Sequence, residues 1–149
     1  MKTQLVVAGY IIYDNKVLLI HHKKLDLWLP VGGHIEENEV PDDALIREIK
    51  EETGLDIEIL NQSNLPMEGN IKRSLAIPFY VNVHNVGDHD HCCLFYLCKP
   101  KNPEQLKINK ELKDARWFTK EELNQSHIPV DVRNIALRAF EMFEKLQRE

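Results

Sequence analysis

Two kinds of hydrophobic pattern alternate along this chain and predict strands and helices in turn. Near the N-terminus, β-branched and aromatic residues over 5–13 and a short apolar run over 17–20 predict two strands. The polar pair Asp14-Asn15 between them suits a tight hairpin turn. Apolar residues recur at helical spacing over 41–53 and from about 130 to 147. Further strands are expected over 56–60, 75–84, 91–99 and 115–118.

The order of these elements is strands, helix, strands, helix. Such an order favours a single α/β (α+β) domain in which helices cover the faces of one mixed sheet. We find no internal repeat, no low-complexity segment and no long linker in the 149 residues, so the whole chain, 1–149, is expected to form one domain.

The helix over 41–53 carries an unusual acidic edge. Pro41 suits its first turn, and Gly54 suits its C-terminal end. At 100° per residue, three glutamates fall within an arc of about 100°, and three apolar side chains fall on the neighbouring arc. The acidic arc holds Glu48, Glu51 and Glu52, and the apolar arc holds Leu45, Ile46 and Ile49.

Carboxylates at this spacing repel one another, so stability alone does not favour them. One interpretation is a solvated acidic face. The other is a divalent-cation site, because ions such as Mg²⁺ prefer oxygen ligands. Two neighbours support the second interpretation: a backbone carbonyl near Gly32-Gly33 could join the coordination shell, and Arg47 could fix a carboxylate by a bidentate bond.

The stretch from Gly33 to Leu55 resembles the Nudix box, G-x5-E-x7-R-E-U-x-E-E-x-G-U, where U is a bulky aliphatic residue. Every specified position matches, namely Gly33, Glu39, Arg47, Glu48, Ile49, Glu51, Glu52, Gly54 and Leu55. Residues 28–30 resemble the usual lead-in of the family, except that Val31 stands before the paired glycines. Residues 116–123 resemble the strand and short helix that follow the box in that family.

The resemblance implies a Nudix-like mixed β-sheet sandwiched between helices. It also implies Mg²⁺- or Mn²⁺-dependent hydrolysis of a nucleoside diphosphate linked to another moiety, X. By motif position, the metal-binding groups are Glu48, Glu51, Glu52 and the Gly32 carbonyl, and Glu39 with Arg47 forms the pair that braces loop and helix. The general base could be one of the three glutamates or a carboxylate outside the box. Our candidate outside the box is Glu111, for which a plain surface role is the alternative.

Three further residues are candidates for substrate contact. Lys23 could meet a phosphate, or it could belong to a solvated hairpin end. Trp28 could stack on a base, or it could be a core aromatic. His34, at an unspecified position of the box, is expected to be exposed. His127 and Pro129, before the last helix, could border the substrate pocket.

A histidine-rich segment follows in the second half of the chain. His84, His89 and His91 allow three interpretations: a transition-metal site, a polar turn with strand histidines, or substrate contact. Alternation along a strand would place His89, His91 and Cys93 on one face.

Charge and cysteine content limit the partners. With 19 Lys and Arg against 24 Asp and Glu, the formal net charge is −5, which argues against non-specific nucleic-acid binding. No apolar run reaches the roughly 18 residues of a membrane span. The three cysteines form no C-x-x-C pair and suit buried thiols of a reducing cytosol, so we expect a cytoplasmic protein.

Two other functions compete with nucleotide hydrolysis. A Nudix-like domain could sense a nucleotide without cleaving it, but such domains often lose box carboxylates and none is lost here. Isopentenyl diphosphate isomerisation on the same fold would need a catalytic cysteine, which the strand cysteines do not clearly provide. The expected partner is a small nucleotide, and the resemblance leaves a homodimer open.

Overall fold

The central strand of the fold is β1, Thr3–Tyr13, in the computed structural model, which describes residues 2–149. The strands that follow are β2 (Lys16–His22), β3 (Trp28–Leu29), β4 (Val31–His34), β5 (Ile57–Ile59), β6 (Tyr80–Asn85), β7 (Asp90–Pro100) and β8 (Leu112–Phe118). The helices are α1 (Pro41–Thr53) and α2 (Val130–Arg148), with short 3-10 turns at Pro103–Gln105 and Glu121–Leu123.

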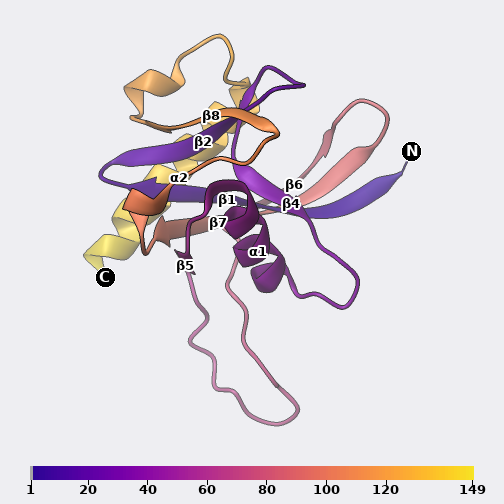
Figure 1. Cartoon of the computed structure of the whole chain (residues 1–149). Helices are drawn as coiled ribbons and strands as arrows, with labels where there is room; N and C mark the ends of the chain where they lie inside the picture. Colours follow the sequence, from indigo (N-terminus) through magenta and orange to yellow (C-terminus); the bar gives the residue numbers. More distant parts are fainter. Residues whose placement is uncertain (1) are drawn as a thin grey trace.

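One mixed sheet contains all eight strands of the described chain. β1 pairs antiparallel with β2 and β4 and parallel with β7. β7 then pairs antiparallel with β5 and β6, and β2 pairs with β3 and β8 (Figure 1). The predicted hairpin is confirmed, because Asp14 and Asn15 both have the positive φ, 53° and 60°, that a tight hairpin turn requires.

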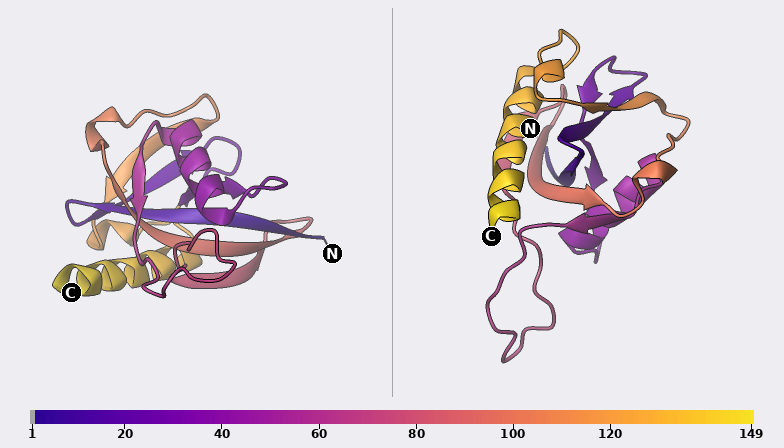
Figure 2. Two further views of the ribbon diagram at one scale, coloured as in Figure 1. Left: turned by 90° about the horizontal axis from the view of Figure 1, so that it is seen from below. Right: turned by 90° about the vertical axis from the view of Figure 1, so that its left-hand side faces the viewer.

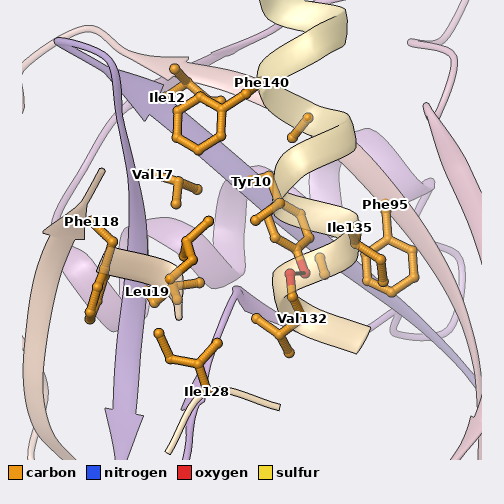
Figure 3. Packing of buried hydrophobic residues seen from close by; sticks show 14 of the residues in the cluster. Tyr10, Ile12, Val17, Leu19, Phe95, Phe118, Ile128, Val132, Ile135 and Phe140 are labelled. Carbon is orange, nitrogen blue, oxygen red and sulfur yellow. Dashed lines mark hydrogen bonds between the residues drawn. The ribbon is translucent and has the colours of Figure 1, made fainter. Parts of the chain in front are cut away.

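The two helices cover opposite faces of this sheet (Figure 2). Side chains of β1 alternate between the faces. Val7 and Ile11 join the core beneath α1, whereas Tyr10 and Ile12 join the core beneath α2. Figure 3 shows the α2 side, where β1, β2, β7 and β8 meet Val132 and its neighbours on the helix. The sequence therefore predicted correctly a mixed sheet sandwiched between helices.

Two local expectations were wrong. Ile46, assigned to the buried arc of α1, is 42% exposed. In its place the first turn buries Asp42, whose Oδ2 accepts a hydrogen bond from the Ala76 backbone N–H. That bond draws residues 75–79 toward α1, and Pro78 has no N–H to give to a sheet, so β6 begins only at Tyr80. The Gly32-Gly33 pair lies within β4.

Candidate active site

Arg47 ties the start of the box to the acidic edge of α1. Its guanidinium donates two bonds to Glu39, Nε to Oε2 at 2.8 Å and Nη2 to Oε1 at 2.9 Å. Nη2 also donates to the His34 backbone oxygen at 3.0 Å, and Nη1 donates to Glu48 Oε1 at 2.9 Å. These bonds lower the pKa of Glu39 to about 2 and raise that of Arg47. The predicted Glu39–Arg47 brace is therefore confirmed, and Arg47 also holds Glu48.

Gly33 makes room for the Glu48 carboxylate. A Cβ atom at position 33 would lie far inside van der Waals contact of all three atoms of that carboxyl group. Gly32 has a different reason to be glycine, because a Cβ there would collide with the β1 backbone at Val7 and Ala8. The paired glycines thus let β4 pair closely with β1 on one side and receive a carboxylate on the other.

Glu52 has a strongly perturbed carboxyl group. Burial, followed by the nearby charges of Glu48, Glu111 and Glu51 and a hydrogen bond with Glu48, raises its pKa to about 8. Its Oε2 atom is buried without a hydrogen-bond partner among residues 2–149. A buried carboxylate oxygen without a partner costs free energy unless a cation or a donor satisfies it.

The donor set fits a hard divalent cation, although the side chains do not form a closed cage. In the described part of the chain, no three His, Cys, Asp or Glu side chains already converge on one point. Glu48 and Glu52 are close enough to share a hydrogen bond, and the Glu51 side chain is 59% exposed. Magnesium commonly binds through one or two carboxylates together with waters and substrate phosphates, so an open pair of this kind suits it.

Glu111 lies at the same end of the molecule. Its charge helps to raise the pKa of Glu52, and it partly offsets the burial that lowers the pKa of His22, so Glu111 lies within electrostatic range of both. The loop that carries it is bonded to the end of β2, since the Lys23 Nζ donates to the Lys110 carbonyl at 2.6 Å. Glu111 is exposed and adjacent to the acidic edge, as a carboxylate outside the box would need to be.

A cavity of about 480 Å³ opens on the α2 face of the sheet and reaches Gly33, the residue that makes room for the Glu48 carboxylate. Its walls are mainly apolar, and among them Tyr10, Phe95, Val132 and Ile135 face one another in Figure 3. The segment after β2 contributes Leu25, Leu27 and Leu29. Its polar lining includes His84, Asn85, His91 and Asp131, and among residues 2–149 no Lys or Arg belongs to it.

The predicted substrate residues are not the ones that line this cavity. Trp28 is only 6% exposed, stacks on His21 at 4.7 Å between centroids and meets Phe118 edge-on, so its faces are used in the core and the base-stacking prediction was wrong. Neither Lys23 nor His34 is among the lining residues. His34 is exposed, as expected, with its Nε2 bonded to Gln4 at 2.7 Å.

Sequence reasoning found part of the cavity and missed the rest. Pro129 borders it as predicted, and His127 does not. The strand alternation that placed His91 and Cys93 on one face was the available signal for the β7 wall. No local pattern indicated that Asp131 lines the cavity, because its position there depends on how α2 packs against the sheet.

The histidine-rich segment does not form a metal site in the described structure. His91 instead lies among three other imidazoles, His34, His84 and His89, with ring centroids 5.0–5.5 Å away. Cys93 lines the cavity, but burial raises the pKa of its thiol to about 12. A nucleophilic thiolate, which the isomerase alternative needs, is therefore unfavourable there.

A mixed sheet between two helices, with a braced acidic helix edge beside an open cavity, defines the class of protein. Residues 2–138 match the NUDIX domain, and the chain belongs to this family. The crystal structure of a Nudix-family hydrolase from Clostridium perfringens superposes with a TM-score of 0.80 at 31% identity, covering 96% of this chain and 99% of that one. Figure 1 and Figure 2 therefore show a Nudix fold.

Two curated relatives match over shorter segments. An 8-oxo-dGTP diphosphatase of Buchnera aphidicola (subsp. Schizaphis graminum) is 43% identical over 61 residues, which cover 38% of this chain and 47% of that protein. An ADP-ribose pyrophosphatase of Methanocaldococcus jannaschii is 51% identical over 53 residues, covering 33% of this chain and 31% of that protein. The matches thus span less than half of each relative. No helix among residues 2–149 is long and apolar enough to cross a membrane.

Proposed function

We propose that this protein is a Mg²⁺- or Mn²⁺-dependent pyrophosphohydrolase that cleaves a nucleoside diphosphate linked to another moiety, X. The observation that carries the proposal is the unpartnered, buried Oε2 of Glu52 beside Glu48. A carboxyl group in this position is neutral unless a cation joins it, and the surrounding negative charge attracts one. The names of the two curated relatives, which are both diphosphate-cleaving enzymes, support the same reaction class.

Glu48, Glu51, Glu52 and the Gly32 carbonyl would hold the cation. When bound, the ion supplies charge neutralisation for the diphosphate and lowers the pKa of a coordinated water. The chain itself supplies positioning: the Arg47 bonds to Glu39 and Glu48 fix one metal-binding carboxylate relative to β4. Glu111, or one of the box glutamates, takes the proton from the attacking water. Preorganised charges of this kind contribute much of the rate of phosphoryl chemistry.

The cavity is the place for the nucleoside. It adjoins Gly33, which also makes room for the Glu48 carboxylate, so we place the diphosphate against the carboxylates and the uncharged part of the substrate in the apolar space. Because no Lys or Arg lines the cavity, a second phosphate group or another anion has no fixed cation to meet there. We therefore place the charged centre of the substrate outside the cavity and its base inside.

The test is a hydrolysis screen with Mg²⁺ and Mn²⁺ over ADP-ribose, nucleoside triphosphates including 8-oxo-dGTP, nucleotide sugars and dinucleoside polyphosphates. We expect metal-dependent cleavage of one class, and a loss of at least about a thousandfold in Glu52→Gln, which keeps the shape but removes the charge. The matched control is Glu58→Gln, an exposed glutamate on β5 that is expected to leave the rate unchanged. Tight nucleotide binding without cleavage would favour the sensing module instead.

A further inference from the structure

A chain of three side chains runs from the surface of the β6–β7 hairpin to the wall of the cavity. Asp88, with a 94% exposed side chain, accepts a hydrogen bond from His89 Nδ1 at 2.7 Å. His89 Nε2 faces His91 Nε2 at 3.2 Å. His91 lines the cavity, and so does His84, which lies on the paired strand directly opposite it.

The partners of this chain fix which ring nitrogen carries each proton. A carboxylate only accepts, so His89 Nδ1 is protonated and the Nε2 of the neutral ring is an acceptor. His91 must then donate from its Nε2, which leaves its Nδ1 as a lone-pair acceptor. On the neighbouring strand, His84 donates from Nδ1 to Asn82 Oδ1 at 2.9 Å, which leaves its Nε2 as an acceptor.

Two acceptor nitrogens therefore remain free on the two histidines that line the cavity. His91 Nδ1 and His84 Nε2 have no hydrogen-bond partner among residues 2–149. Burial and the neighbouring imidazoles of His34, His84 and His89 lower the pKa of His91, which keeps its ring neutral. A neutral imidazole with one nitrogen already engaged accepts a single further hydrogen bond.

We propose that His84 and His91 form a hydrogen-bond acceptor pair for the part of the substrate that enters the cavity, and that His89 and Asp88 set the polarity of His91. The ligand group is a neutral N–H or O–H donor, carried either by the nucleobase or by the sugar. The inference rests on the proposed function, because it places the nucleoside in this cavity. His89 contacts His91 and does not itself line the cavity, so it is a positioning residue.

Calorimetric titration with nucleoside diphosphates in the presence of Mg²⁺ tests the inference. The probes are ADP and GDP, their 2′-deoxy forms, and the diphosphates of purine riboside and inosine, which each lack one amino group. We expect His91→Phe and His84→Phe to weaken binding of the preferred probe by about three- to tenfold, the effect of losing one neutral hydrogen bond. The control is Val83→Phe, because Val83 lies on β6 next to His84 but is 62% exposed on the opposite face.

The deletion probes identify the donor. If the donor is a base amino group, His91→Phe has no further effect on the probe that lacks this group; if it is the 2′-hydroxyl, the same holds for the 2′-deoxy probe. His89→Phe should weaken binding as well, and His89→Gln, whose amide can accept at the Nε2 position, should restore it.

Equal binding by the wild type and both phenylalanine variants would overturn the inference, as would an equal loss in Val83→Phe or the absence of binding by every probe. Hydrolysis assays on the same preparations report on the proposed function separately. A protein that hydrolyses substrate with histidine-independent binding contradicts only the acceptor pair. A protein that binds nucleotides through His91 without cleaving them contradicts only the hydrolase.

Discussion

The two ends of the site differ in the side chains that form them, which are charged at the α1 end and mainly apolar at the α2 end. At the α1 end, Arg47 joins Glu39 and Glu48 in a compact hydrogen-bonded network, and Glu52 keeps one buried oxygen unsatisfied. At the α2 end, many apolar side chains share the wall of the cavity, and few polar groups interrupt them. Changes at the first end should therefore affect the chemical step strongly, and changes at the second should affect mainly substrate affinity.

Gly33→Ala should produce the largest effect in this comparison. The added methyl group occupies the space of the Glu48 carboxylate, so we expect a loss of about a hundredfold in kcat, as for other changes that displace the support of a metal ligand. Initial rates with Mg²⁺ and with Mn²⁺ measure it. The control is Glu58→Gln, the exposed glutamate on β5. Wild-type turnover by Gly33→Ala would show that activity does not require the Glu48 carboxylate in its present position.

Arg47→Lys should lower kcat by about tenfold or more. Lysine keeps the positive charge but cannot bond both oxygens of Glu39 and reach Glu48 and the His34 carbonyl as well. The measurement is kcat together with the melting temperature. Arg138→Lys, an exposed arginine paired with Glu141 on α2, should match the wild type in both. If kcat and the melting temperature of Arg47→Lys also matched the wild type, the bonds of Arg47 would contribute to neither activity nor stability.

Leu25→Asp should affect the cavity end alone. Leu25 is 56% exposed and lines the cavity, so a carboxylate there places a negative charge beside the apolar space without disturbing the core. We expect KM to rise by about three- to tenfold with kcat within about twofold of the wild type. Leu65→Asp, which is 74% exposed and does not line the cavity, should change neither constant. A fall in kcat without a rise in KM would contradict the separation of the two ends.

The smallest expected effect is a pH dependence of stability without metal. The folded pKa of Glu52 is about 8, above the ordinary value of 4.5, so folding binds a proton in this window. That contribution to stability is complete below about pH 4.5 and is lost as the pH rises through 8. Glu39, with a folded pKa of about 2, acts in the opposite direction and only below about pH 4.5.

The melting temperature of the metal-free protein should therefore fall from pH 6 to pH 8.5, by an amount on the order of 5 °C. Millimolar Mn²⁺ should reduce the fall, because the cation replaces the proton on Glu52. Glu52→Gln cannot ionise and should show a flatter profile with and without metal. A wild-type profile as flat as that of the variant would contradict the assignment of this titration to Glu52.

Local sequence patterns determine much of the α1 end, which is why it could be predicted. The boundaries of α1 agree with the Pro41 and Gly54 signals, and the Glu39–Arg47 contact was implied by the resemblance to the Nudix box. The cavity end depends on how segments that are distant in the sequence pack together. The predictions that were wrong failed for the same reason. Trp28 is removed from any ligand by His21 and Phe118, which lie on two different strands. Ile46 is exposed because the helix turns other residues toward the core, namely Asp42, Ala44, Leu45, Ile49 and Thr53.

The most direct test of the central claim is a Mn²⁺ titration followed by electron paramagnetic resonance, with the wild type, Glu52→Gln and Glu58→Gln compared at pH 7.5. The claim is that a divalent cation binds to the buried carboxyl group of Glu52, whose Oε2 has no hydrogen-bond partner among residues 2–149. We expect the wild type and Glu58→Gln to bind Mn²⁺ with the same affinity and to release a proton, and Glu52→Gln to bind at least tenfold more weakly without that release. Equal Mn²⁺ affinity and proton release in all three proteins would contradict the account.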